Sequence, residues 1–206
     1  GGVHRGIVQR KGDSGMMESR PKLQSETVGR GGESDGGKMA VAVSQAVRKV
    51  LGINEINPGS TTPFSIAIIS LDRPERLNEE RGKKGVELCM WSIVENLSEA
   101  GFLPENIVFL GETEVVAVMP EADWDYAQGR VDLALTRHDG YARTVNSGAQ
   151  WHASAGIASY PRDEKRIFEL SRWAERALSI ARFMGSDASF SWSDADEGNS
   201  PARRAS

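Results

Sequence analysis

Apolar residues are concentrated in runs of strand length and in longer segments where they recur every three or four positions. The run Phe64–Leu71, FSIAIISL, is almost continuously apolar, which is typical of a central strand covered on both faces. In Asn106–Pro120, two apolar runs flank the short polar interruption Gly111–Glu114, and this pattern predicts a β-hairpin. Further strands are expected at Gln150–Tyr160 and Ala188–Trp192.

The 3.6-residue period of amphipathic helices occurs in four segments. They are Val41–Leu51, Val86–Ala100, the weakly periodic Ala122–Leu135, and the strongly periodic Ile167–Phe183. Pro74 is well placed to open a further helix after the first strand. Arg137–Gly148 is expected to be a loop, with room for a short strand around Tyr141–Val145.

The predicted elements follow the order strand, helix, hairpin, helix, strand, helix, strand. Because one pair of strands is joined by a tight hairpin and the others by helices, we expect an α/β (α+β) fold with a mixed, mainly antiparallel central sheet flanked by helices. Residues 63–193 form the predicted domain, preceded by a short helix and connector at 39–62. The polar segments 1–38 and 194–206 are expected to be disordered tails or linkers.

Composition excludes several classes of protein. The formal net charge of -4 and the pI of about 5.5 give no general electrostatic basis for binding nucleic acid or an anionic membrane. No apolar run is long enough to form a membrane segment. The single cysteine, Cys89, cannot form an internal disulfide and fits a reducing cytoplasm, where we expect the protein to reside. Its apolar helical surroundings predict a buried, inert thiol.

Candidate chemistry is concentrated at the hairpin tip, Gly111–Glu114, which carries two carboxylates. Such a turn can hold a metal ion or descend from a turn that did, and a purely structural turn is the preferred interpretation. The histidines, His4, His138 and His152, lie far apart and lack the spacing of metal ligands. The mixed charge run at residues 79–84 is interpreted as the solvated edge of a helix.

Four segments carry a more specific pattern. They are IISLDRPERLNEERG (Ile68–Gly82), FLGETEVVAVMP (Phe109–Pro120), SAGIASYP (Ser154–Pro161) and AERALSIARFMGSDASF (Ala174–Phe190). In this order they resemble the D-x-D-x-F-K-x-x-N-D-x-x-G, Y-G-G-D-E-F, S-x-G-x-A and A-D-x-A-L-Y-x-A-K-x-x-G-R-N segments of the GGDEF family of diguanylate cyclases. The resemblance covers about Pro63–Trp192 and implies a palm-like nucleotidyl cyclase fold. Residues 63–193 are therefore interpreted as a degenerate GGDEF-like domain, with GETEV in place of the signature at Gly111, Glu112, Thr113, Glu114 and Val115.

The resemblance implies a metal site at this turn, because the family holds Mg²⁺ against GTP with carboxylates from two adjacent strands. The first of these carboxylates falls on Ser70 and the second on Thr113. A neutral hydroxyl cannot neutralise a divalent cation as a carboxylate does. Acidic residues remain nearby as displaced ligands at Asp72, Glu112 and Glu114.

The nucleotide-binding positions implied by the resemblance are also altered. Glu112 stands at the second glycine of the signature, and Glu75 stands at the lysine that follows the first strand. Positive charge is kept at Arg182, which matches the lysine of the closing segment. Asn78 matches the asparagine that recognises guanine in the family. The stretch 102–105, where product-inhibited cyclases carry R-x-x-D, contains no arginine.

These departures together predict a catalytically inactive domain, since phosphoryl transfer depends on positioning and charge neutralisation. We expect it to act as an interaction, regulatory or dimerisation module in bacterial cyclic di-GMP-type signalling, with itself or another signalling protein as partner. It would have no catalytic residue and no resident metal or cofactor. Two alternatives remain. One is a sensor that binds GTP, with Mg²⁺ only then, through Asn78, Arg182 and Asp72 without turnover. The other is an active cyclase that uses Asp72 and Glu114 as displaced metal ligands.

Overall fold

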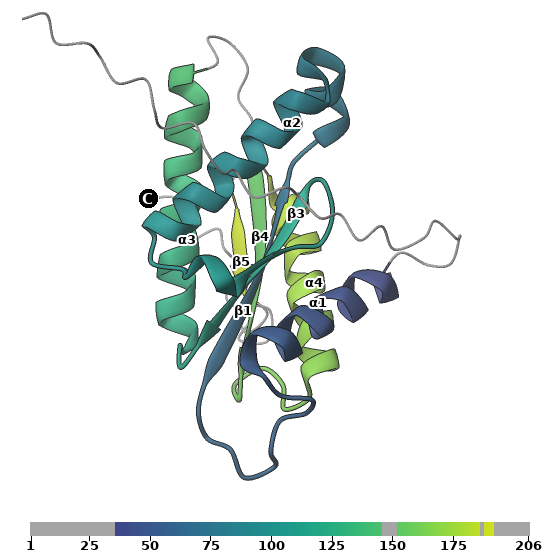
Figure 1. The fold of residues 1–206 in the computed structure, drawn as a ribbon, viewed down its shortest axis with the longest axis vertical. Helices are drawn as coiled ribbons and strands as arrows, with labels where there is room; N and C mark the ends of the chain where they lie inside the picture. Colours follow the sequence, from purple (N-terminus) through teal and green to yellow (C-terminus); the bar gives the residue numbers. More distant parts are fainter. Residues whose placement is uncertain (1–35, 146–151, 186–187, 192–206) are drawn as a thin grey trace, which may run out of the picture.

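The computed structural model describes residues 36–145, 152–185 and 188–191, and a five-stranded sheet lies at its centre (Figure 1). The strands are β1 (Phe64–Leu71), β2 (Ile107–Phe109), β3 (Glu114–Pro120), β4 (Ala153–Tyr160) and β5 (Ser189–Ser191). Their spatial order is β2-β3-β1-β4-β5. Neighbours are antiparallel except for β4 and β5, which run parallel. The predicted fold class, a mixed and mainly antiparallel sheet flanked by helices, is confirmed.

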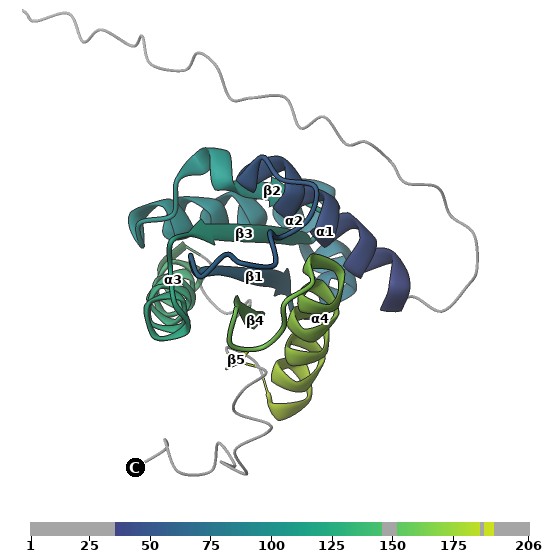
Figure 2. The same cartoon turned by 90° about the horizontal axis from the view of Figure 1, so that it is seen from below.

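Helices cover both faces of the sheet (Figure 2). One face packs against α2 (Pro74–Glu99) and α3 (Trp124–Val145), and the other packs against α1 (Gly36–Leu51) and α4 (Ile167–Met184). A 3₁₀ turn at Pro104–Asn106 leads into β2. Among the helices of the described residues, none combines the length and the apolar character needed to cross a bilayer.

The central strand β1 contributes to both cores. Ile66 and Ile68 pack with α1 and α4, whereas Ala67 and Ile69 pack with α2 and α3. All of its residues are buried, so neither set of alternate positions needs polar side chains. This burial explains the continuous apolar run, and the strand has the predicted bounds.

Helix α1 is an integral part of the second core. Val43 and Val47 are fully buried in the cluster that contains residues of β1, β3 and α4. The helix begins at Gly36 rather than at Val41, so it includes the last residues of the segment predicted to be a tail. Residues 1–35 of the tail predicted at 1–38, and the whole tail predicted at 194–206, lie outside the described residues.

The loop predicted at Arg137–Gly148 is wrong, because α3 continues to Val145 and no strand forms at Tyr141–Val145. The polar sequence of this segment lacks an apolar period. Extending an existing helix adds one backbone hydrogen bond per residue and needs no apolar face, so periodicity could not report it. The positions 146–148 lie outside the described residues.

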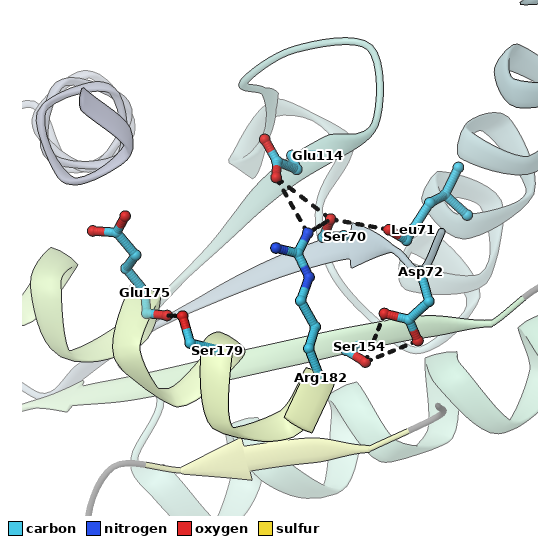
Figure 3. A network of polar contacts seen from close by, with 8 residues as sticks. All are labelled: Ser70, Leu71, Asp72, Glu114, Ser154, Glu175, Ser179 and Arg182. Carbon is cyan, nitrogen blue, oxygen red and sulfur yellow. Dashed lines mark hydrogen bonds and ion pairs between the residues drawn. The ribbon is translucent and has the colours of Figure 1, made fainter. Parts of the chain in front are cut away.

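The two C-terminal strands form where they were predicted, with shorter bounds. β4 begins at Ala153 rather than at Gln150, and β5 is Ser189–Ser191. Residues 150–151 and Trp192 lie outside the described residues. α4 comes after β4 in the chain and runs back along the sheet. Its last turn therefore reaches the C-terminal end of β1, next to the acidic turn between β2 and β3 (Figure 3).

Candidate functional site

The GETEV segment connects the antiparallel strands β2 and β3, as the hairpin prediction requires, and lies beside the C-terminal end of β1. Strand β3 pairs with β1 in a register that places Glu114 opposite Ser70. The backbone N–H of Leu71 donates to the carbonyl of Thr113 at 3.0 Å, and the N–H of Leu110 donates to the carbonyl of Glu114 at 2.9 Å. These bonds fix the turn at the sheet edge.

Register also decides which side chain of the turn meets β1. Side chains of directly opposite residues lie on the same face of a sheet, so Glu114 faces Ser70. Thr113 contributes its carbonyl to the ladder at the next position. Val115 is fully buried and belongs to the core beneath α2 and α3. Of the turn's two carboxylates, Glu114 therefore faces β1, whereas Glu112 is exposed.

Arg182, on the last turn of α4, reaches this face (Figure 3). Its Nη2 donates a hydrogen bond to Ser70 Oγ and lies 3.3 Å from Glu114 Oε1. Ser70 Oγ in turn lies 3.5 Å from the same Glu114 oxygen and 3.3 Å from the carbonyl of Leu71. Three side chains from three elements thus form one charge-neutral cluster, which we call the Ser70–Glu114–Arg182 cluster.

Asp72 lies next to this cluster, and its carboxylate points toward Ser154 of β4 (Figure 3). Its two carboxylate oxygens accept hydrogen bonds from Ser154 Oγ at 2.9 and 3.0 Å. Its backbone N–H donates to the carbonyl of His152 at 2.8 Å. The carboxylate is therefore held against β4 by Ser154, and the backbone of Asp72 is bonded to the residue that precedes the strand.

Glu112 is paired across the turn with Lys83. The Lys83 Nζ lies 2.6 Å from Glu112 Oε1, and both side chains are exposed. The hydrogen bond and charge of Glu112 raise the pKa of Lys83 above its ordinary value. Lys83 directly follows Gly82, where α2 is interrupted by a φ of 68° and a ψ of 177°.

Asn78 and Glu75 lie on the part of α2 that precedes this break, and both side chains are exposed. The sequence-predicted residues therefore fall into two groups. The structure brings Glu114 and Arg182 together with Ser70, and it leaves Asn78 on the surface of α2. Asp72 belongs to neither group and is bonded to Ser154 of β4.

Sequence reasoning missed two partners in this site, Lys83 and Ser154. Lys83 was placed in a solvated charge run, although its position directly after a helix-interrupting glycine is a usable signal. Ser154 pairs with Ser70 in the β1–β4 register, so it could be found only after the strand order was known. Neither residue type is diagnostic by itself.

The donor set at the turn is a poor match for a divalent cation. Mg²⁺ favours several carboxylate or phosphate oxygens, whereas Ser70 and Thr113 offer hydroxyls. Glu114 is neutralised by a guanidinium, and Glu112 by an ammonium. Within the described residues, no three histidine, cysteine, aspartate or glutamate side chains gather as a group that could hold a metal ion.

Comparison with solved structures finds the same fold in bacterial GGDEF and GGEEF domains. The active GGEEF domain of a diguanylate cyclase from Vibrio cholerae is similar with a TM-score of 0.56 and 17% identity, over 75% of this chain and 93% of that one. The GGDEF domain of DgcB from Caulobacter crescentus, in complex with c-di-GMP, has a TM-score of 0.56 and 13% identity, over 76% and 86%. The GGDEF domain of YfiN from Pseudomonas aeruginosa has a TM-score of 0.55 and 20% identity, over 74% and 91%.

The comparison with curated proteins found no match. A family model described as "Diguanylate cyclase, GGDEF domain" matches residues 53–187, which is more than half of the chain. This range contains the strands β1 to β4, the GETEV turn and Arg182, and it ends before β5. The chain therefore belongs to the GGDEF domain family.

Proposed function

We propose that this GGDEF domain is catalytically inactive and serves as a cytoplasmic regulatory, interaction or dimerisation module in cyclic di-GMP-type signalling. The observation that carries the proposal is the Ser70–Glu114–Arg182 cluster. Where cyclase chemistry would need negative oxygens around a divalent cation, this site holds a hydroxyl, one carboxylate and a guanidinium. Phosphoryl transfer gains its rate from positioning the phosphates and neutralising their charge, and a divalent cation held by carboxylates contributes to both. The carboxylates that would hold this cation are missing from the site.

The second ion pair at the turn supports the same conclusion. A glycine at residue 112 would let the backbone approach a phosphate, but Glu112 presents a carboxylate there. The carboxylate would repel a triphosphate, and Lys83, which could attract one, is already paired with it. The turn is thus neutralised by groups within the chain.

The packing of α1 supports a regulatory role. α1 contacts α4 and β3, which are the elements that supply Arg182 and Glu114. A displacement of α1 by a partner or a fused domain would therefore move the two elements that carry the cluster. A domain without catalysis can transmit such a displacement to a partner, and we propose a second copy of the chain or another signalling protein as that partner.

A turnover assay tests the loss of catalysis. The purified protein is incubated with GTP and Mg²⁺ or Mn²⁺, and the products are separated by chromatography, with an active GGDEF domain as the positive control. We expect no cyclic di-GMP. Light scattering on the same sample measures the oligomeric state, because the reaction joins two bound GTP molecules and a monomer would give a false negative. Formation of cyclic di-GMP would refute the proposal.

The sensor alternative is favoured by one observation, the exposed side chain of Asn78 on the first part of α2. Calorimetric titration of GTP in the presence of Mg²⁺ separates it from the main proposal. Saturable binding without product, lost in Asn78→Ala, would establish a sensor. A strictly monomeric protein that binds neither GTP nor a signalling partner would contradict both functions.

A further inference from the structure

The Nη2 of Arg182 occupies a position between two adjacent strands. It contacts Ser70 from β1 and Glu114 from β3, and these two residues are directly opposite in the register. A small cation bound at this end of the strand pair would contact the same two side chains. Figure 3 shows the guanidinium between these two side chains, so its nitrogen takes the position in which such a cation would lie.

Charge balance at this position is complete. Glu114 contributes one negative charge and Arg182 one positive charge, while Ser70 contributes none. A metal ion entering here would meet the repulsion of a fixed positive charge, and at these separations that repulsion is large even in a partly hydrated site. Of the other nearby carboxylates, Glu112 is paired with Lys83 and Asp72 is bonded to Ser154.

Arg182 is delivered by a rigid element. Leu178 and Ala181, within the turn that precedes it, are buried at 1% and 0% exposure. The backbone of α4 also lies directly against Gly156 of β4. Because the helix is fixed on the sheet, the guanidinium cannot diffuse away as a bound ion can. Much of the entropy that a free ion would lose on binding is, for this group, already lost when the protein folds.

We propose that Arg182 is a covalently tethered substitute for a divalent cation and that it excludes metal from the end of the β1–β3 pair. Residue 182 then decides metal binding jointly with the residues that would supply the ligands. A carboxylate placed at residue 70 would share the one positive charge of Arg182 with Glu114, and it would create a metal site only after the guanidinium is removed.

Mn²⁺ binding without any nucleotide tests this proposal, since electron paramagnetic resonance counts the free ion directly. The proteins compared are the wild type, Ser70→Asp, and Ser70→Asp combined with Arg182→Gln. Ser70→Asp combined with Arg172→Gln is the matched control, because Arg172 also lies on α4 but pairs with Glu169. We expect Mn²⁺ to bind at least tenfold more tightly to the Arg182→Gln double variant than to Ser70→Asp alone, with no comparable gain in the control.

A gain of less than tenfold, or an equal gain in the Arg172→Gln control, would overturn the proposal. Ser70→Asp combined with Arg182→Ala keeps the test decisive if the Arg182→Gln double variant does not fold, because it removes the same guanidinium and keeps the added carboxylate. Mn²⁺ should raise the unfolding temperature of this variant and leave that of the wild type unchanged, and an equal response of the two would also overturn the proposal. The turnover assay contains GTP and uses the wild type, so its failure is distinguishable from failure here.

Discussion

Gly156 of β4 is the point at which the sheet and α4 approach most closely, and its replacement by alanine should be strongly destabilising. A Cβ at this position would lie 2.1 Å from the carbonyl oxygen of Ala174, 2.2 Å from the N of Leu178 and 2.7 Å from the Cα of Leu178. All three are backbone atoms of α4, so no side-chain rotation can relieve the overlap. The helix would have to move.

The size of the effect follows from these distances. Ordinary van der Waals contact begins at 3.4 Å, so α4 must withdraw by about 1.3 Å from its 2.1 Å contact. The withdrawal loosens the packing of Ala174 and Leu178, both of which are buried. Overpacking a core costs about 1–3 kcal/mol and occasionally more, and a clash with a helix backbone belongs at the upper end. We therefore expect Gly156→Ala to lower the free energy of unfolding by about 3 kcal/mol.

Urea unfolding followed by circular dichroism measures this change. With a typical slope of about 1–3 kcal/mol per molar urea, a loss of about 3 kcal/mol moves the midpoint by about 1–3 M. Gly129→Ala is the matched control, because Gly129 is exposed within α3 and an added Cβ would meet nothing within 4 Å. This control should gain about 0.5–1 kcal/mol through helix propensity. If Gly156→Ala unfolds within about 0.5 kcal/mol of the wild type, the close approach of α4 to β4 is refuted.

Three further outcomes can be measured with the same protein. Val47→Ala should lower the free energy of unfolding, measured with urea, by about 2 kcal/mol, because this α1 side chain is fully buried. If α1 were detached from the domain, the substitution would change this free energy by almost nothing. Ser65→Ala should lower the free energy of unfolding by about 1–3 kcal/mol, since Ser65 Oγ is bonded in a buried site to Ser159 Oγ at 2.7 Å and to the carbonyl of Ala122 at 3.0 Å. Adding Ser159→Ala should recover part of this loss, and strictly additive losses would contradict the account. Cys89 is partly buried rather than buried as predicted, and this partial burial raises the pKa of its thiol to about 11. At pH 8 the native thiol should therefore react with a disulfide reagent more slowly than the urea-unfolded thiol, and equal rates would contradict the partial burial. The same raised pKa favours folding below pH 9 and loses this contribution as the pH rises toward 11.

The local pattern of apolar residues was sufficient to predict the strands and helices that bury at least one face. The continuous run of β1, the hairpin of β2 and β3 and the strong period of α4 all reflect burial within a few residues of each position. The C-terminal part of α3 escaped prediction for the same reason, since its polar sequence carries no record of burial. Backbone hydrogen bonds extend a helix without leaving an apolar pattern.

The sequence by itself determined which chemical groups are present at the site. It established hydroxyls at Ser70 and Thr113, carboxylates at Glu112 and Glu114, and a guanidinium at Arg182. Family resemblance added the expectation that the turn and the end of β1 lie together. Both conclusions depend on residue identity and order alone.

Only the tertiary structure decided how these groups are partnered. Ser70 and Arg182 are 112 positions apart, and Glu114 and Arg182 are 68 apart, so no local period connects them. Their contact depends on the register of β1 with β3 and on the docking of α4 against β4 at Gly156. A shift of one residue in a strand register would turn Glu114 to the opposite face of the sheet. Charge neutralisation within this site is therefore a property of packing, because ion pairs form only where the fold brings the side chains within reach.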